Sequence, residues 1–156
     1  MEDKQIMVEL IQPHSTEYHR ACQLRYELFF AEHDLPWDVV FNQRQANDFH
    51  ASISIEDRLV AYGQLVPQCD RIYQICQMVV EPSYQRQNLG RKILSFLIEI
   101  AKQEGAIALT LNARLTAVGF YQKLGFKTFG TPFPSITTGI PHIAMNRKMY
   151  YECSNN

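Results

Sequence analysis

The segment from residue 81 to residue 97, EPSYQRQNLGRKILSFL, combines residue types that could bind an anion. A polar run, Gln85 to Asn88, leads directly into apolar residues at helical spacing. The N-terminus of a helix exposes unpaired N–H groups and carries about half a positive charge, so a loop curling into it can surround a phosphate. Gly90 permits close approach to the backbone, and Arg86 and Arg91 add local positive charge. The alternative is a plain surface loop before a helix, and the spacing alone does not decide.

Composition limits the partners that such a site can serve. The chain has 156 residues, the usual length of one domain, and we expect residues 1–156 to form a single domain. The formal net charge is −1, so overall charge does not point to nucleic acid or a membrane surface, and any anion site must be local. The opening residues, MEDKQIMVEL, lack the basic and apolar regions of a signal peptide. We therefore expect a cytoplasmic protein without a nucleic-acid or membrane partner.

Cysteine spacing points to a reducing compartment. The four cysteines are scattered and form no CxxC pair: Cys22, Cys69, Cys76 and Cys153. This pattern predicts free thiols, no disulfide framework and no zinc site. Cys76 falls inside a predicted strand, where we expect it to be a buried small apolar residue, with no neighbouring base in the sequence to activate it.

The elements that must position the loop begin with one helix and a run of strands. Residues 4–12 alternate and predict a first strand, and Ser15 or Thr16 can then cap a helix. Three further segments, rich in β-branched and aromatic residues, are separated by short polar turns. They predict three consecutive antiparallel strands, 50–55, 59–67 and 72–80.

The second half of the chain alternates helices and strands. Helices are predicted at 89–103 and 116–124, each followed by a glycine that can stop it, Gly105 and Gly125. Strands are predicted at 106–111, 126–129 and 141–149, and the first, wholly apolar, is expected to be central and buried on both sides. We expect an α+β fold, with a mixed, mostly antiparallel sheet of six to seven strands and helices on both faces.

Two blocks of this sequence resemble motifs of the GNAT N-acetyltransferases. The family's acyl-CoA-binding motif is usually Gln/Arg-x-x-Gly-x-Gly/Ala. Here Gln85 matches its first position, Asn88 replaces the first glycine, and Gly90 matches the last position. The run FYQKLGF at 120–126 resembles the family's FYxKxGF helix.

Two more blocks are similar to the small bacterial ElaA-like and YjcF-like branch of the family. They are GIPHI at 139–143 and LRYELFFAEH at 24–33. With the two motifs above, they occur in the expected order and span nearly the whole chain.

The resemblance implies acetyl-CoA as co-substrate and no metal. In the family, the strand before the loop bulges and splays from its neighbour, and the pantetheine arm pairs with its exposed edge. The pyrophosphate then lies on backbone N–H groups at the start of the helix. Asparagine tolerates a left-handed backbone, so we expect a working but weaker cradle at Asn88. The implied cofactor-binding residues are Met78, Val79, Val80, Gln85, Arg86, Gln87, Asn88, Leu89, Gly90, Arg91, Asn112, Arg114 and Tyr121.

Two residues are implied as catalytic. Tyr121 matches the family's tyrosine that donates a proton to the departing sulfur, and a phenol pKa of about 10 is close to a thiol pKa of about 8.5. Its alternative role is core packing beside Phe120. His142 could deprotonate the amine, directly or through water, or orient the neighbouring loop.

The acceptor site is less defined by sequence. Glu32, His33 and Asp48 come from the segment that usually shapes the acceptor pocket, together with His142. Asn112 could bond cofactor or substrate, or cap a strand. Arg114 stands where many family members have an asparagine that contacts pantetheine, so it could instead reach a phosphate or an acidic substrate.

The predicted activity is transfer of an acetyl group from acetyl-CoA to a primary amine of a small molecule or peptide, by direct attack in a ternary complex. The alternative is a CoA-binding sensor or structural module without turnover, because Asn88 and Arg114 depart from the family pattern. Aminosugar phosphate, polyamine, amino acid and protein amine all stay open as acceptors. Residues 131–135, TPFPS, could be a homodimer contact or a loop.

Overall fold

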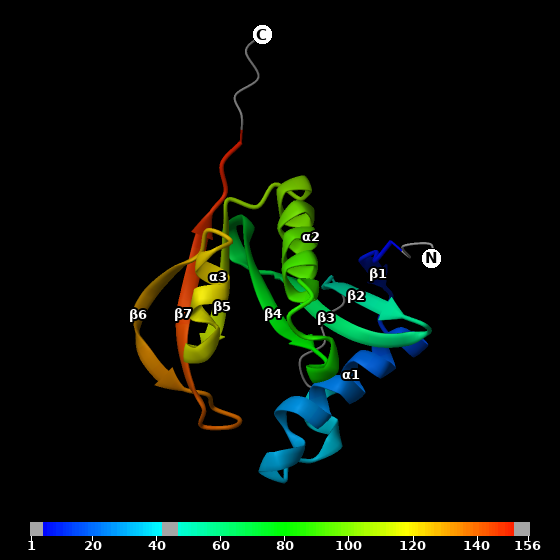
Figure 1. Cartoon of the computed structure of the whole chain (residues 1–156). Helices are drawn as coiled ribbons and strands as arrows, with labels where there is room; N and C mark the ends of the chain where they lie inside the picture. The colour runs from blue at the N-terminus through cyan, green and yellow to red at the C-terminus, as the bar shows by residue number, and fades with distance from the viewer. Residues whose placement is uncertain (1–4, 42–46, 152–156) are drawn as a thin grey trace.

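A computed structural model describes residues 5–41 and 47–151 of the chain (Figure 1). Its helices and strands follow the chain in this order: β1 (Glu9–Ile11), α1 (Thr16–Phe29), η1 (Ala31–His33), η2 (Trp37–Phe41), β2 (Phe49–Ile55), β3 (Arg58–Pro67), η3 (Cys69–Arg71), β4 (Ile72–Val80), η4 (Pro82–Tyr84), α2 (Leu89–Gln103), β5 (Ala108–Arg114), η5 (Leu115–Ala117), α3 (Val118–Gln122), β6 (Lys127–Pro134) and β7 (Pro141–Lys148).

The described strands form one seven-stranded sheet in the order β1-β2-β3-β4-β5-β7-β6. The strands β2, β3 and β4 pair in sequence and antiparallel, as predicted from their short polar turns. The pair β4–β5 is parallel, because α2 carries the chain back between them, and β7 then inserts antiparallel between β5 and β6. The predicted mixed, mostly antiparallel α+β sheet is confirmed.

Helices cover both faces of this sheet. On one face α2 packs so closely on β3 that a Cβ added at Gly63 would lie 2.6 Å from Ile93 Cγ2 and 2.6 Å from Met78 Sδ. On the other face α1 contributes Tyr18 to a cluster that includes Tyr62 of β3. In Figure 1, α2 and α3 lie over the same face of the sheet. The predicted two-faced packing is confirmed.

The helix boundaries follow local chemistry in the sequence. The Ser15 hydroxyl accepts a hydrogen bond from Tyr18 N (3.1 Å), so Ser15 is the N-cap of α1. Both predicted glycine stops adopt the left-handed conformation, with φ of +79° at Gly105 and +89° at Gly125. Beyond Gly105, Ala106 N donates to the carbonyl five residues back at 2.9 Å, which satisfies a carbonyl in the last turn of α2.

Two strands at the sheet edges differ in length from their predictions. β1 spans three residues, Glu9–Ile11, rather than residues 4–12. β6 runs on to Pro134 and so takes in most of the segment read as a loop or dimer contact. Its two prolines are tolerated because β6 is an edge strand, and the pairing with β7 shifts between Phe129 and Phe133.

The strand predicted at 106–111 is also corrected. β5 is central, between β4 and β7, but it runs from Ala108 to Arg114. Its side chains alternate between buried Leu109, Leu111 and Ala113 and more exposed positions, so it is not buried on both sides. The reason is that the neighbouring strand β4 pairs with β5 only over a short segment and then diverges from it.

Candidate active site

The sheet opens between its two parallel strands. β4 and β5 pair from Ile72–Ala108 to Gln74–Thr110 and no further, so the later part of β4 has no strand on that side. On its other side, the pairing of β4 with β3 shifts register, and Gln77 adopts φ 57° at this bulge. The bulge bends β4 away from β5. The splay and bulge that the family resemblance implied are therefore present.

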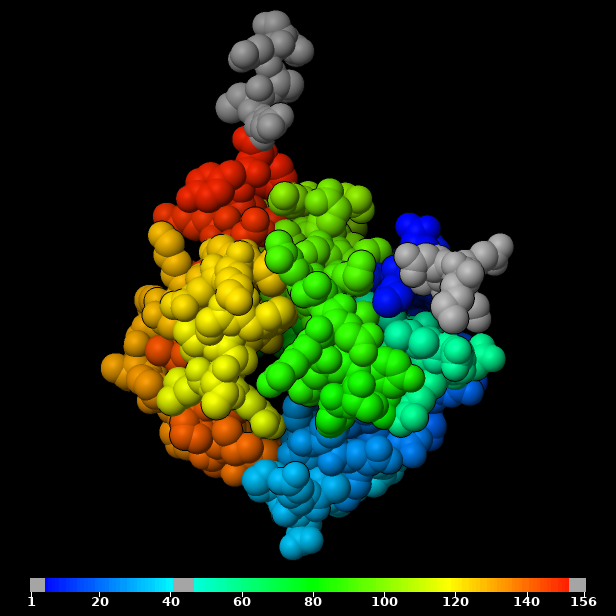
Figure 2. Space-filling model, viewed as in Figure 1, coloured from blue at the N-terminus to red at the C-terminus, as the bar shows by residue number. Residues whose placement is uncertain are grey.

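A cleft of about 700 Å³ fills this opening. Figure 2 shows the surface hollowed between the green segment that begins α2 and the yellow segment that contains α3. Five residues predicted from the sequence line the cleft: Met78, Asn112, Arg114, Tyr121 and His142. The splayed strands therefore gather residues from β4, β5, α3 and β7 around one space.

The loop before α2 has the backbone of an anion cradle. Arg86 and Asn88 adopt left-handed conformations, with φ of 65° and 62°. Asn88 is the N-cap of α2 and makes no side-chain cap, and Lys92 N makes the first intrahelical bond, to Asn88 O at 3.0 Å. The N–H groups of the preceding residues, Leu89 to Arg91, thus have no acceptor within the helix. Such groups at a helix start suit a phosphate.

Gln85 stabilises this loop rather than entering the cradle through its side chain. Its Nε2 donates to Val80 O at 3.1 Å, which joins the end of β4 to the last residue before the left-handed turn. Glu81, at the start of the loop, also pairs with Arg58 of β3. These two contacts hold the loop against the sheet.

Gly90 faces the gap between α2 and α3. A Cβ added there would lie 3.5 Å from Phe120 Cζ and 3.6 Å from Val80 Cγ2, which is ordinary contact. Neither the backbone conformation nor close packing therefore requires glycine at this position. A larger side chain would instead extend toward Phe120 and Val80, beside the first turn of α2.

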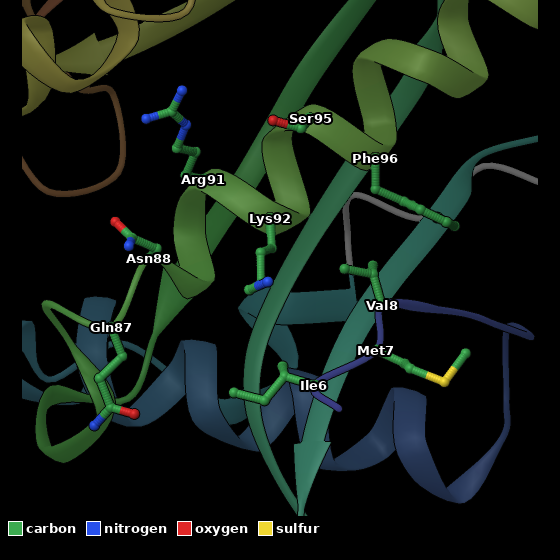
Figure 3. Close-up of a pocket in the computed structure, with 9 residues that line it drawn as sticks. All are labelled: Ile6, Met7, Val8, Gln87, Asn88, Arg91, Lys92, Ser95 and Phe96. Carbon is green, nitrogen blue, oxygen red and sulfur yellow. The ribbon is translucent and has the colours of Figure 1, made fainter. Parts of the chain in front are cut away.

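A second pocket, of about 660 Å³, lies beside the first turns of α2 (Figure 3). Gln87 and Asn88 line it, with the cations Arg91 and Lys92, and the segment 6–8 forms its far wall. In Figure 3, Arg91 points away from that segment. Two cationic side chains therefore lie in the first turn of α2, beside the open helix terminus.

Tyr121 is buried at the inner side of the cleft. Its ring makes edge contacts with Phe120 (5.0 Å between centroids) and Phe126 (6.0 Å). Within the part of the chain that the structure describes, its hydroxyl has no hydrogen-bond partner. Burial, and to a lesser degree the Cys76 thiol nearby, raises the pKa of Tyr121 to about 12. The phenol therefore stays protonated near neutral pH and can donate into the cleft.

A backbone carbonyl two residues earlier in the chain orients the ring of His142. Its Nδ1 lies 2.8 Å from Ile140 O, and because a carbonyl can only accept, Nδ1 carries the hydrogen. The ring also stacks on Phe133, with centroids 6.4 Å apart and planes 28° apart. In the neutral imidazole, Nε2 is then left as an acceptor. Arg114 of β5 is the register partner of His142 of β7.

Cys76 also lines the cleft, and is half-buried rather than fully buried as expected from its strand. Burial first, and then Asp48, raise the pKa of the Cys76 thiol to about 12. A thiol with such a pKa is not a nucleophile near neutral pH.

Three residues predicted for the acceptor site do not line the cleft. Glu32 and His33 are exposed on the short helix η1, Ala31–His33. Asp48 is buried and accepts a hydrogen bond from the side chain of Gln64, so it stands behind the cleft wall. Their role in binding an acceptor stays a prediction.

Other residues of the cleft wall were not predicted as site residues. Phe29, Phe30 and Gln64 line it, with four residues of the β6–β7 connection, Ser135, Ile136, Thr137 and Thr138. Gln64 carried a signal, since a polar amide in the apolar run of β3 is unusual. The others become neighbours through the tertiary fold alone.

Comparison with known proteins identifies the family. A family model described as Acetyltransferase (GNAT) domain matches residues 27–149. The chain therefore belongs to the GNAT acetyltransferase family, as its four sequence blocks indicated. The uncharacterized protein YyaT of Bacillus subtilis (strain 168) is 29% identical over 138 residues, covering 85% of this chain and 90% of YyaT.

Solved structures share the fold. The crystal structure of Escherichia coli ElaA has a TM-score of 0.79 at 20% identity and covers 92% of this chain and 100% of ElaA. A crystal structure of aminoglycoside 6′-N-acetyltransferase complexed with coenzyme A has a TM-score of 0.77 at 17% identity and covers 95% of this chain and 99% of that one. At such identities the likeness concerns the fold.

The described residues, 5–41 and 47–151, contain neither a membrane-spanning helix nor a cluster of metal ligands. None of the helices there is long and apolar enough to cross a membrane. Those residues also contain no group of three or more histidine, cysteine, aspartate or glutamate side chains that could hold a metal ion.

Proposed function

We propose that this protein transfers an acetyl group from acetyl-CoA to a primary amine of a small molecule or peptide. The observation that carries the proposal is the opening between β4 and β5, with an open helix terminus at one end. A long flexible thioester with a diphosphate fits that combination, because one part needs an unpaired strand edge and the other needs backbone donors. The neighbour solved with coenzyme A supports this choice of co-substrate.

The coenzyme would be bound mainly by backbone groups. Its pantetheine arm would pair with the free edge of β4 at Met78–Val80, whose side chains pack into the cores on the two faces. The diphosphate would accept hydrogen bonds from N–H groups of residues 86–91, and Arg91 and Lys92 would balance its charge. Asn88 adopts the left-handed conformation for which the family usually uses glycine, so the replacement leaves the cradle geometry intact.

His142 and Tyr121, which both line the cleft, would act on different groups: the attacking amine and the departing sulfur. Acetyl-CoA supplies the acetyl thioester. His142 Nε2 accepts a proton from the amine, whose nitrogen forms the new bond to the acetyl carbon. The carbon–sulfur bond breaks, its electron pair leaves with the sulfur, and the Tyr121 hydroxyl donates a hydrogen bond to that sulfur.

The perturbed acidities favour this direct route. With a pKa of about 12, Tyr121 is a weaker acid than a thiol, so it stabilises the departing thiolate by hydrogen bonding rather than by complete proton transfer. Cys76, with a pKa also raised to about 12, is held as a thiol. Transfer through an acyl-enzyme on Cys76 is therefore disfavoured, and we propose attack within a ternary complex.

We propose an amine as the molecular partner. We also propose that a second copy of the chain can bind to form a homodimer. One structural neighbour is named an aminoglycoside 6′-N-acetyltransferase. One sequence relative is named a ribosomal protein bS18-alanine N-acetyltransferase. These names indicate that similar proteins acetylate amines of different size. The strand β6 is exposed along its whole length at the sheet edge and includes Phe129 and Phe133. A homodimer through this edge stays a prediction.

A thermal-shift screen tests the proposal. We expect acetyl-CoA to raise the melting temperature by mass action, and candidate amines then to be acetylated with release of free thiol. Gly90→Val should abolish the shift because valine fills the gap beside Phe120 and Val80. Gly119→Val is the matched control, since Gly119 has open space around it and lies outside the cradle. Absence of a shift in the unaltered protein would refute the proposed function.

A further inference from the structure

The charge of the cleft wall is one-sided. Among the described residues that line the cleft, Arg114 is the one lysine or arginine, and neither aspartate nor glutamate is present. The remaining polar lining consists of neutral amides, hydroxyls and one thiol: Gln64, Gln68, Gln74, Gln77, Asn112, Tyr121, Ser135, Thr137, Thr138 and Cys76. A cleft with this lining repels a polycation and attracts an anion.

Arg114 is oriented but not neutralised. Its guanidinium carbon lies over the ring of Phe29, 5.0 Å from the ring centroid, a cation–π contact that occupies none of its N–H groups in a hydrogen bond to a carboxylate. Within residues 5–41 and 47–151, no carboxylate lies within ion-pair distance of Arg114. A half-buried guanidinium of this kind can donate two parallel hydrogen bonds to a carboxylate or phosphate.

Arg114 is also close to the proposed proton acceptor. It is the register partner of His142, and opposed residues on antiparallel strands have Cβ atoms about 5 Å apart on the same face. The cations of the diphosphate cradle, Arg91 and Lys92, line a different pocket beside α2. Arg114 is therefore placed to bind the acceptor rather than the diphosphate.

We infer that the acceptor is an amine that also carries an anionic group, either a carboxylate or a phosphate, and that Arg114 binds this group. The inference rests on the proposed acetyl transfer and narrows its substrate class. An anion on Arg114 would leave the amine a short chain away, beside His142 Nε2. Arg114 is thereby a specificity-determining residue.

Matched amines test the inference. We would compare 4-aminobutyrate with butylamine for the carboxylate, phosphoethanolamine with ethanolamine for the phosphate, and include spermidine as a cation. At saturating acetyl-CoA we expect kcat/KM to be about 10-fold or more higher for the anionic member of at least one pair, the usual gain from a charge-assisted bidentate contact. The pair that shows the preference identifies the anion.

Variants then assign the preference to one side chain. Arg114→Gln should reduce the anionic-to-neutral ratio of kcat/KM to about 1, chiefly through KM, whereas Arg114→Lys should keep part of it as a point charge. Lys127→Gln is the matched control, because Lys127 is an exposed cation on β6 outside the cleft, and it should leave the ratio unchanged.

Failure of the inference differs from failure of the proposed function. Equal or better rates with neutral amines or spermidine would overturn the inference while acetyl transfer stands, and so would an unchanged ratio in Arg114→Gln. If no amine is acetylated, a binding measurement still tests the inference. In that case 4-aminobutyrate or phosphoethanolamine should raise the melting temperature of the CoA-saturated protein. No shift with either compound would overturn the inference.

Discussion

Burial and the proposed role in catalysis place different demands on the phenol of Tyr121. Burial in the aromatic contacts with Phe120 and Phe126 makes the hydroxyl a weak acid, with a pKa of about 12. The same burial leaves it without a protein partner among the described residues, so its hydrogen bond is available to a ligand. A hydrogen-bond donor that never ionises near neutral pH is suited to stabilising a thiolate as it forms.

The substitution Tyr121→Phe separates these two roles. We expect kcat to fall about 100-fold, the lower end of what positioned acid catalysis contributes, because the donor to the sulfur is lost. Phenylalanine keeps the ring contacts, so the melting temperature and the affinity for acetyl-CoA should stay close to those of the unaltered protein. Steady-state kinetics and titration calorimetry check both parts. Unchanged turnover would assign Tyr121 to packing.

Asn88 offers a test of the cradle backbone. Its φ of 62° costs a glycine nothing and strains a β-branched residue by about 1–3 kcal/mol. Asn88→Gly should therefore bind coenzyme A at least as tightly, and Asn88→Val should bind it roughly 10-fold or more weakly. Calorimetric titration of both variants measures this, and equal affinities would show that the left-handed turn does not matter for binding.

The thiol in the cleft distinguishes direct transfer from a covalent route. Cys76→Ala removes the sulfur near Tyr121, and we expect turnover within about 3-fold of the unaltered protein because the high pKa keeps the thiol out of the chemistry. Steady-state rates give the comparison. Loss of turnover together with loss of an acetylated-protein species in mass spectra would instead support an acyl-enzyme.

Among the elements, the packing of α2 on the sheet depends on one glycine of β3. A Cβ at Gly63 would lie 2.6 Å from Ile93 Cγ2 and from Met78 Sδ, so Gly63→Ala should lower the free energy of unfolding by about 1–3 kcal/mol. Displaced Met78 would also disturb the edge of β4. Urea denaturation measures the change.

Gly119→Ala is the natural comparison for that experiment. Nothing lies within 4 Å of a Cβ at Gly119, and it is a helical position in α3, so alanine should be neutral or stabilising by up to about 1 kcal/mol. Equal unfolding free energies for Gly63→Ala and Gly119→Ala would contradict the packing described between α2 and β3.

Elements with strong local patterns could be predicted from the sequence. The meander β2-β3-β4, the helix α2 and the glycine stops at Gly105 and Gly125 follow from periodicity and turn chemistry. The ends of the edge strands could not be predicted from the sequence, because β6 continues through prolines that only an edge position tolerates. The length of an edge strand depends on its partner, which local sequence does not reveal.

The site was predictable to the extent that it is made of backbone. The proposed cradle at residues 86–91 belongs to one continuous loop, so its residue types alone predict an anion site there. Phe29 and Gln64 of the cleft wall could not be predicted, because they come near Arg114 only through the tertiary fold, where β4 diverges from β5. Glu32 and His33 do not line the cleft, because they lie exposed on the short 3-10 helix η1.

For the molecule as a whole, we expect the free energy of unfolding to fall at alkaline pH because two tyrosine hydroxyl groups are buried. The pKa of Tyr121 is raised from 10.0 to about 12, so below pH 10 the phenol is protonated in both states and has no effect on the pH dependence. Between pH 10 and pH 12 it ionises in the unfolded chain first, and stability falls. Burial raises the pKa of Tyr62 as well, which adds to this loss.

Tyr121→Phe isolates one of these contributions. Between pH 9 and pH 11 the unaltered protein should lose about 1 kcal/mol more unfolding free energy than Tyr121→Phe does, because the variant has no phenol to ionise. Urea midpoints at pH 9, 10 and 11 provide the measurement. Parallel curves for the two proteins would mean that Tyr121 is as accessible to ionisation when folded as when unfolded.

At the scale of the whole molecule, the proposed binding mode places a thioester arm in the opening between β4 and β5 and its diphosphate at the start of α2. The most direct measurement is a crystal structure with coenzyme A bound. We expect the diphosphate within hydrogen-bond distance of N–H groups between Arg86 and Arg91, and the arm alongside Met78–Val80. A coenzyme bound elsewhere, or a cradle filled by its own side chains, would contradict the account.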